Sequence, residues 1–290
     1  RLDGTFTGWR SELGDTVALH ATLAGGRLDV QRGRLELGPV SLTADGQWAL
    51  AGGGGGAIRY ELQVASLEPL APYLPPDAAG RARFARGSLQ ASGQIAGTLE
   101  APVMSGRVQA RDFRFGEWAA ERLDGDYSAE FTGGGLPTID AELAGTEIRT
   151  PSGDFETLAL DVDFTRPTFR LAVRADPAGG GVLEVQAGGR IEEAGGREID
   201  LQVVEVDLED QRWRLSSPAR IAWTSGEAVR VENLRLQRTD GEGLMALNGI
   251  VAPFDQADFA VEVQRLPVGE LLRLVGVDYG VEGELSLDGT

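Results

Sequence analysis

His20 is the only histidine of the chain, and the sequence contains no cysteine. A Ser-His-Asp triad would therefore have to use His20, and thiolate nucleophiles, cysteine zinc sites and multi-histidine metal sites are excluded. His20 follows Val17-Ala-Leu19 in an alternating segment, where its side chain would point away from that of Leu19. This pattern predicts an exposed histidine without a catalytic role.

Carboxylates are abundant, and pairs of them could form a glycosidase site or a calcium loop. The densest groups are Glu192-Glu193 and the run from Glu205 to Asp210, while Asp161-Val-Asp163 lies inside an alternating segment. Most acids occupy the polar positions of such segments, which indicates a solvated face. No loop of the Asp-x-Asp-x-Asp-Gly type is present, so we predict no metal site.

Glycine-rich loops can cradle a phosphate when a buried strand precedes them, a helix follows and a lysine is near. Gly52 to Gly56 instead leads into an alternating segment at Ile58, and all 27 basic residues are arginines. We interpret the clusters among the 41 glycines as turns, because glycine adopts positive φ at little cost. The sequence therefore predicts a protein that is not an enzyme and holds no cofactor.

The net charge narrows the function classes further. The 290 residues include 45 acidic and 27 basic side chains, giving a formal charge of −18. Nucleic-acid binding is excluded, because phosphate contacts need clustered positive charge.

No apolar run approaches the roughly 18 residues of a membrane-spanning helix. The chain starts at Arg1 and stops at Thr290 inside what resembles a new repeat, so we expect an internal part of a longer protein.

Alternation of apolar and polar residues is the dominant pattern. Ile58 to Val64, Phe155 to Phe164, Phe169 to Val173 and Phe259 to Val263 each place apolar side chains on one face. Turn residues separate such segments about every 8–13 residues. The pattern predicts an all-β fold, mostly antiparallel, with one apolar and one solvated face.

Two kinds of interruption organise the chain. The alternation slips by one position within Ala110 to Phe113 and within Val203 to Val206, which predicts a bulge or short turn at each. Leu67 to Leu74 and Leu266 to Leu274 have the apolar spacing of short amphipathic helices. Within one continuous architecture, without independent globular domains, we expect a β segment at 1–66, a short helix and loop at 67–86, a second β segment at 87–265, a short helix at 266–282 and the start of a new repeat at 283–290.

The phrase Gly-Ser-Leu-Gln-Ala-Ser-Gly-Gln-Ile-Ala-Gly-Thr-Leu-Glu-Ala-Pro, from Gly87 to Pro102, and the following strand from Val103 to Phe113 resemble a signature passage of the AsmA-like/TamB superfamily. Leu62 to Leu74 and Val263 to Leu271 are similar to its strand-to-helix phrases. The resemblance implies an elongated, U-shaped sheet, called a β-taco, with an apolar concave interior. It implies no active site.

The resemblance also implies a place and partners. Members of the superfamily are anchored in the inner membrane of diderm bacteria and cross the periplasm. They carry phospholipid between the membranes and, with an outer-membrane partner of the TamA type, support the assembly of autotransporters and other β-barrel clients. A groove that buries acyl chains would suit this task, because each buried CH₂ is worth about 0.8 kcal/mol.

The apolar face then supplies the candidate lining of a lipid groove, although ordinary core packing would account for each residue equally well. The candidate lining residues are Ile58, Tyr60, Leu62, Val64, Val108, Phe113, Phe115, Leu158, Leu160, Val162, Phe164, Phe169, Leu171, Val173, Leu201, Val203, Leu234, Leu236, Phe259, Val261 and Val263.

Three other functions share the alternating pattern. A scaffold that pairs its sheet edge with unfolded β-barrel clients would need no lipid. A transmembrane β-barrel would carry aromatic girdles, whereas aromatic residues make up 7% of the chain and are scattered. A β-helical adhesin would repeat about every 20–30 residues, a period that the sequence does not show.

Overall fold

A computed structural model gives the fold of the chain in two units. The described residues are 2–7, 16–50, 55–73, 84–98, 100–132, 137–151, 153–192, 196–208, 211–224, 228–252, 257–267 and 284–289. Contacts within the chain define unit 1 as Arg1–Glu147 and unit 2 as Ile148–Thr290. Each unit is described by itself.

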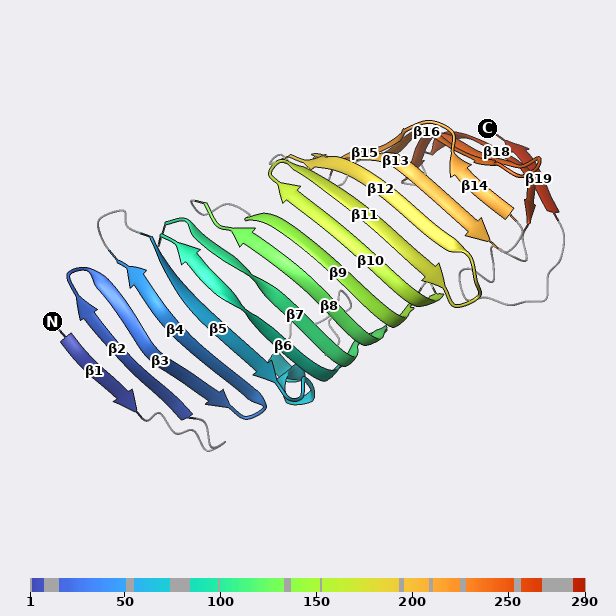
Figure 1. The fold of residues 1–290 in the computed structure, drawn as a ribbon. Helices are drawn as coiled ribbons and strands as arrows, with labels where there is room; N and C mark the ends of the chain where they lie inside the picture. The colour runs from blue at the N-terminus through green and yellow to red at the C-terminus, as the bar shows by residue number, and fades with distance from the viewer. Residues whose placement is uncertain are drawn as a thin grey trace. The chain divides into compact units, whose positions relative to one another are not determined.

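Unit 1 is a meander of antiparallel strands in sequence order (Figure 1). Its strands are β1 Leu2–Thr7, β2 Thr16–Ala24, β3 Arg27–Leu37, β4 Val40–Ala49, β5 Gly56–Val64, β6 Ala85–Gly97, β7 Pro102–Phe115, β8 Trp118–Glu130 and β9 Thr138–Thr150, whose last residues belong to unit 2. Each strand from β1 to β7 pairs with the next one along the chain.

Unit 2 follows the same plan with one branch. Its strands are β10 Gly153–Thr165, β11 Thr168–Pro177, β12 Val182–Ile191, β13 Gly196–Leu208, β14 Gln211–Leu215, β15 Ala219–Thr224, β16 Val229–Arg238, β17 Leu244–Ala252, β18 Asp258–Pro267 and β19 Glu284–Gly289. Neighbours in sequence pair from β10 to β13 and from β16 to β19. Between these groups, β14 and β15 each pair with part of β13 and part of β16.

The predicted all-β, antiparallel fold is confirmed. Every described pairing with a register is antiparallel, and the described residues contain no α-helix. β5 shows why the alternating sequence selects this fold, since exposed residues alternate with half-buried or buried ones along its whole length. Successive side chains of a strand point to opposite faces, so the polar residues meet water and the apolar residues share the other side.

Bulges interrupt the alternation where the sequence slips. Asp112 adopts a φ of 49°, and the pairing of β6 with β7 shifts register beside it, between Arg86 and Ser88. In β13 the register against β12 shifts between Leu201 and Val203. A bulge adds one residue to a strand and increases its local bend and twist. The first predicted slip therefore corresponds to a real irregularity, whereas the second irregularity lies just before the predicted segment, between Leu201 and Val203.

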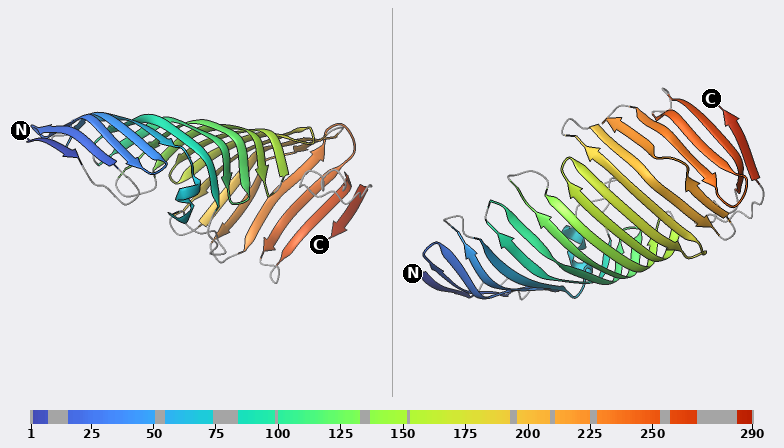
Figure 2. Two further views of the ribbon diagram at one scale, coloured as in Figure 1. Left: turned by 90° about the horizontal axis from the view of Figure 1, so that it is seen from below. Right: turned by 45° about the horizontal axis from the view of Figure 1, so that its top comes forward.

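The predicted helices differ from the structure. In place of an amphipathic α-helix at Leu67 to Leu74, Glu68–Tyr73 forms a 3₁₀ helix, η1, which lies against β6 (Figure 2). Pro69 and Pro72 lack backbone donors, which disfavours a regular α-helix here. The second predicted helix, 266–282, lies almost wholly outside the described residues, and its first two positions instead end β18 at Pro267.

The packed core is thin for a chain of this size. Alanine is the commonest of the buried apolar residues, and no large side chain in the described part is less than 2% exposed. The chain exposes 18020 Å², whereas one compact protein of its mass would expose about 12,000 Å² and two compact halves about 14,000 Å² together. In the described strands, most large apolar side chains are half-buried rather than fully buried.

Candidate functional site

The apolar side chains of unit 1 form rows across its strands, because residues directly opposite one another in paired strands share a face. One row, from β3 to β7, contains Leu35, Leu42, Leu62, Ala91 and Val108. A second contains Leu37, Val40, Val64, Leu89 and Ala110, and a third contains Val30, Gly46, Ile58, Ile95 and Met104. We call the side of each unit that carries such rows its apolar face.

A pair of tyrosines lies in the middle of this face. Tyr60 of β5 and Tyr127 of β8 share a row with Gly93 and Gly106, which stand between them on β6 and β7. The two hydroxyls form a hydrogen bond. A Cβ on Gly93 would lie only 2.8 Å from the Tyr60 hydroxyl oxygen, so Tyr60 leans across the glycine. We call this arrangement the tyrosine bridge.

The tyrosine bridge places polar atoms on an otherwise apolar row. Burial raises the pKa of the Tyr60 hydroxyl, and its hydrogen bond with Tyr127 raises that pKa further. Both effects favour the neutral phenol over the charged phenolate. The bridge therefore adds hydrogen-bonding capacity to the apolar face without adding charge.

Unit 2 has a longer set of rows. One of them crosses from β10 to β18 and contains Phe164, Phe169, Gly189, Ile199, Ile221, Val231, Gly249 and Phe259. Beside it run two shorter rows, Val162, Leu171, Ala187 and Leu201, and Leu160, Val173, Val185 and Val204. Further rows contain Leu234, Leu247 and Val261, and Leu236, Met245, Val263 and Leu287. The large side chains of these rows are mostly half-buried.

The structure brings together nearly all the candidate lining residues within their units. Leu158 faces buried Ala175, while Phe113 and Phe115 lie opposite buried Ala120 and Ala85. The others occupy the rows above, with one exception. That they line a lipid groove stays a prediction.

Val203 is the exception, and its assignment to the apolar face is wrong. The register shift in β13 places Val203 opposite Gln186, which is exposed, and places Val204 opposite Val185. Residues that are paired across strands share a face, so Val204 takes the place expected for Val203. The sequence predicts the slip after Val203, whereas the register shifts before it. Val203 and Val204 are both apolar, so either of them could continue the alternating pattern.

Several residues of the apolar face are absent from the sequence-based set. Leu35, Leu42 and Leu89 lie in alternating segments that predicted strands but were not assigned to the lining. Ile221 and Val231 join the long row of unit 2 through pairing with β13 and β16. Alternation identifies the apolar side of one strand, but only the register shows which strands bring such sides together.

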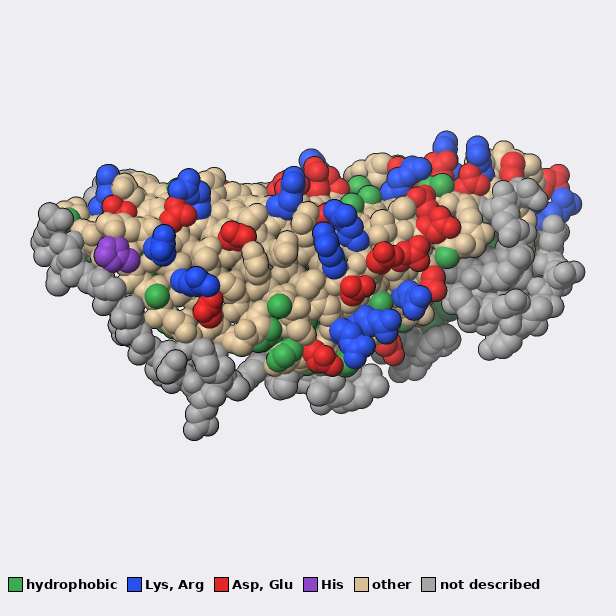
Figure 3. Space-filling model, turned by 60° about the horizontal axis from the view of Figure 1, so that its bottom comes forward, with side chains coloured by type: hydrophobic (Ala, Val, Ile, Leu, Met, Phe, Trp, Pro, Cys, Tyr) green, Lys and Arg blue, Asp and Glu red, His purple; other side chains and the backbone are tan. Residues whose placement is uncertain are grey.

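The opposite face carries the charges. Figure 3 shows basic and acidic side chains gathered over one face of the strands, with His20 among them. Arg107 Nε lies 3.1 Å from Asp126 Oδ1, and Arg214 Nη2 lies 3.0 Å from Glu205 Oε1. These arginines are more than half exposed, so each pair adds little stability. His20 is exposed, as predicted.

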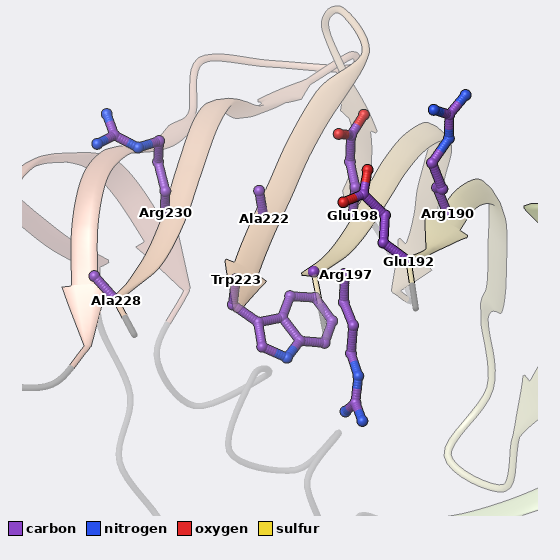
Figure 4. A pocket seen from close by; sticks show the side chains of 9 residues that line it. Arg190, Glu192, Arg197, Glu198, Ala222, Trp223, Ala228 and Arg230 are labelled. Atoms are coloured by element: carbon purple, nitrogen blue, oxygen red, sulfur yellow. The ribbon is translucent and has the colours of Figure 1, made fainter. Parts of the chain in front are cut away.

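Two hollows in the described part of the chain are bordered largely by polar side chains. One of 650 Å³ lies over Gly188 and is bordered by Arg170 and Asp200, among others. Another, of 410 Å³, lies at the ends of β12, β13 and β15 and is bordered by Arg190 and Glu198 (Figure 4). Within the described ranges, no group of three acidic or histidine side chains could hold a metal ion, and no helix is long and apolar enough to span a membrane.

Comparisons with known proteins add no family assignment. No protein-family model, curated protein or solved structure matches the chain. The candidate site consists of the rows of the two apolar faces and the few polar groups that lie on them.

Proposed function

We propose that the apolar faces of the two units shield the acyl chains of phospholipids in transit between membranes. The observation that carries this proposal is the row from Phe164 to Phe259, which crosses unit 2 and whose phenylalanine and isoleucine side chains are half-buried. In a soluble protein, a contiguous apolar surface well above a few hundred Å² marks a binding surface or an aggregation site. An extended apolar surface without polar pockets is well suited to binding acyl chains.

We further propose that each sheet curls toward its apolar face, as a U-shaped trough requires. Glycines on that face support this. A Cβ on Gly93 would overlap the carbonyl oxygen of Ser105, and a Cβ on Gly189 or Gly249 would overlap a carbonyl oxygen of the neighbouring strand. Such close backbone approach is what glycine permits at tight bends of a sheet.

A trough of this kind lowers the barrier to moving a lipid through water. Each CH₂ group kept out of water is worth about 0.8 kcal/mol, so a chain of about 14 carbons gains on the order of 10 kcal/mol from an apolar surface. Rows of Leu, Val, Ile and Phe bind such chains without directional contacts. The lipid can therefore slide from one row to the next.

The resemblance of Gly87 to Pro102 to the AsmA-like/TamB superfamily supports the setting of this activity. We propose that the chain belongs to an inner-membrane-anchored protein that crosses the periplasm. Its partners are phospholipid, an outer-membrane protein of the TamA type and β-barrel client proteins. The proposed task is lipid supply to the outer membrane together with support of outer-membrane protein assembly.

Photo-crosslinking in cells tests the proposal directly. A benzophenone side chain at Leu160 or Leu171 would stand on the apolar face, while one at Asp161 or Arg170 would stand on the charged face one residue away. We expect phospholipid adducts, identified by mass spectrometry, at the first pair of positions and not at the second. Equal capture on both faces, or capture of unfolded β-barrel proteins with no lipid, would overturn lipid shielding.

A further inference from the structure

An arginine and a tryptophan lie side by side at the border of the apolar face of unit 2. Arg197 of β13 is paired directly with Trp223 of β15. The next residues of the same face are Ile199 and Ile221, which belong to the long apolar row. Arg197 and Trp223 therefore stand one step beyond that row, toward the ends of their strands.

Figure 4 shows that these two side chains point to one side of the sheet, while Arg190, Glu192, Glu198 and Arg230 point to the other. All of them border the hollow of 410 Å³. Glu198 is engaged on its own side, where its Oε1 lies 3.2 Å from Arg220 Nε. Arg197 has no ion pair with any carboxylate of the described residues, in contrast to Arg220. Its side chain is exposed and points to the apolar side.

The chemistry of the pair suits a phosphate group at the edge of an apolar surface. A guanidinium presents planar, paired N–H donors that match phosphate oxygens. An indole combines a large apolar ring with one N–H donor and favours boundaries between apolar and wet surroundings. Residues on one face of a strand are about 7 Å apart, a spacing that the glycerol group of a lipid can bridge from phosphate to acyl chain.

We propose that Arg197, beside Trp223, binds the phosphate of a phospholipid whose acyl chains lie on the row containing Ile199, Ile221 and Val231. This inference rests on the proposed function and adds a position for the head group. It makes unit 2 selective for lipids that carry a phosphate over lipids that have the same chains and no charge.

The test compares phosphatidylglycerol with diacylglycerol of identical chains, each presented to the 290-residue chain in nonionic micelles. Binding is followed by tryptophan fluorescence and by calorimetry. We expect tighter binding of phosphatidylglycerol, and we expect Arg197→Gln to weaken it about tenfold or more while leaving diacylglycerol binding unchanged. Arg197→Lys, which keeps the charge and loses the planar donors, should weaken it less.

Arg230→Gln is the matched control, because Arg230 borders the same hollow but points to the opposite side. It should change neither affinity. Circular dichroism of each variant checks that the fold is retained, and an Arg197→Gln protein that has lost its strands is replaced by Arg197→Lys for the comparison.

The outcomes separate this inference from the proposed function. If wild-type protein binds both lipids equally and Arg197→Gln has no effect, the head-group position is wrong and acyl-chain shielding stands. If neither lipid binds, the proposed function itself fails. A third arm uses inorganic phosphate: binding of free phosphate at millimolar concentration, lost in Arg197→Gln, would show a general anion site and overturn a lipid-specific one.

Discussion

At the scale of single residues, the tyrosine bridge is the most distinctive feature of the apolar face. Tyr60 and Tyr127 come from strands separated by two others, and their hydroxyls satisfy each other above Gly93 and Gly106. The small residues between them leave the space that the rings fill, as aromatic side chains do elsewhere over glycines in sheets. The bridge keeps the face continuous where glycine would leave a gap.

Titration of tyrosine absorbance tests the bridge. Burial and the hydrogen bond raise the pKa of Tyr60. We therefore expect Tyr60 to ionise at higher pH than an ordinary tyrosine, which titrates at about pH 10. Tyr127→Phe removes the hydrogen-bond partner and should lower the pKa of Tyr60 toward that value. Tyr60→Phe should remove the late-titrating group altogether. A wild-type chain with no tyrosine titrating above the ordinary range would contradict this assignment.

The same shift has a consequence for stability. Above about pH 10 the unfolded chain loses the Tyr60 proton while the folded chain retains it, so the folded state binds more protons. The free energy of unfolding should therefore fall as the pH rises past that value. Urea unfolding measured over this pH range should show a shallower decline in Tyr60→Phe. An unchanged decline would assign the effect to other groups.

At the scale of elements, glycines decide how closely neighbouring strands approach. Gly93 of β6 and Gly106 of β7 are directly paired, and a Cβ on either would overlap backbone of the other strand. Bulges act at other points, as at Asp112 with its positive φ. Close approach of two strands and bulges both bend a sheet. A regular strand with large side chains allows neither of them.

Gly93→Ala tests the close approach. We expect a loss of about 1–3 kcal/mol in the free energy of unfolding of unit 1, because the added methyl group forces β6 and β7 apart. Gly188→Ala is the control, since the nearest atom to its Cβ would be 3.5 Å away. That substitution should leave stability unchanged or raise it slightly. Equal effects of the two substitutions in thermal unfolding would show that the close approach does not constrain β6.

At the scale of the whole molecule, the balance of buried and exposed surface is unusual. An area of 18020 Å² stays exposed, and most charged residues of the described strands occupy the faces that the apolar rows do not, with Arg197 as an exception. The net charge of −18 therefore lies mainly on solvated strand positions. A net charge of this size favours solubility and discourages self-association.

Calorimetry tests this balance. The heat capacity change on unfolding follows the apolar surface newly exposed. Because no large side chain of the described residues is fully buried, we expect a value per residue below the usual range of about 12–15 cal/mol/K. Addition of phospholipid should raise the melting temperature, since a ligand that binds only the folded state stabilises it. A value within the usual range, with no effect of lipid, would indicate a conventional closed core.

The sequence by itself determined the strands, their apolar and polar sides and the approximate places of two bulges, because a period of two and turn glycines are local properties of the chain. It did not determine the register, and for that reason it placed Val203 rather than Val204 on the apolar face. Only the tertiary structure brought Tyr60 onto Tyr127 and Arg197 beside Trp223. These pairs join residues distant in sequence, and strand pairing decides which of them meet.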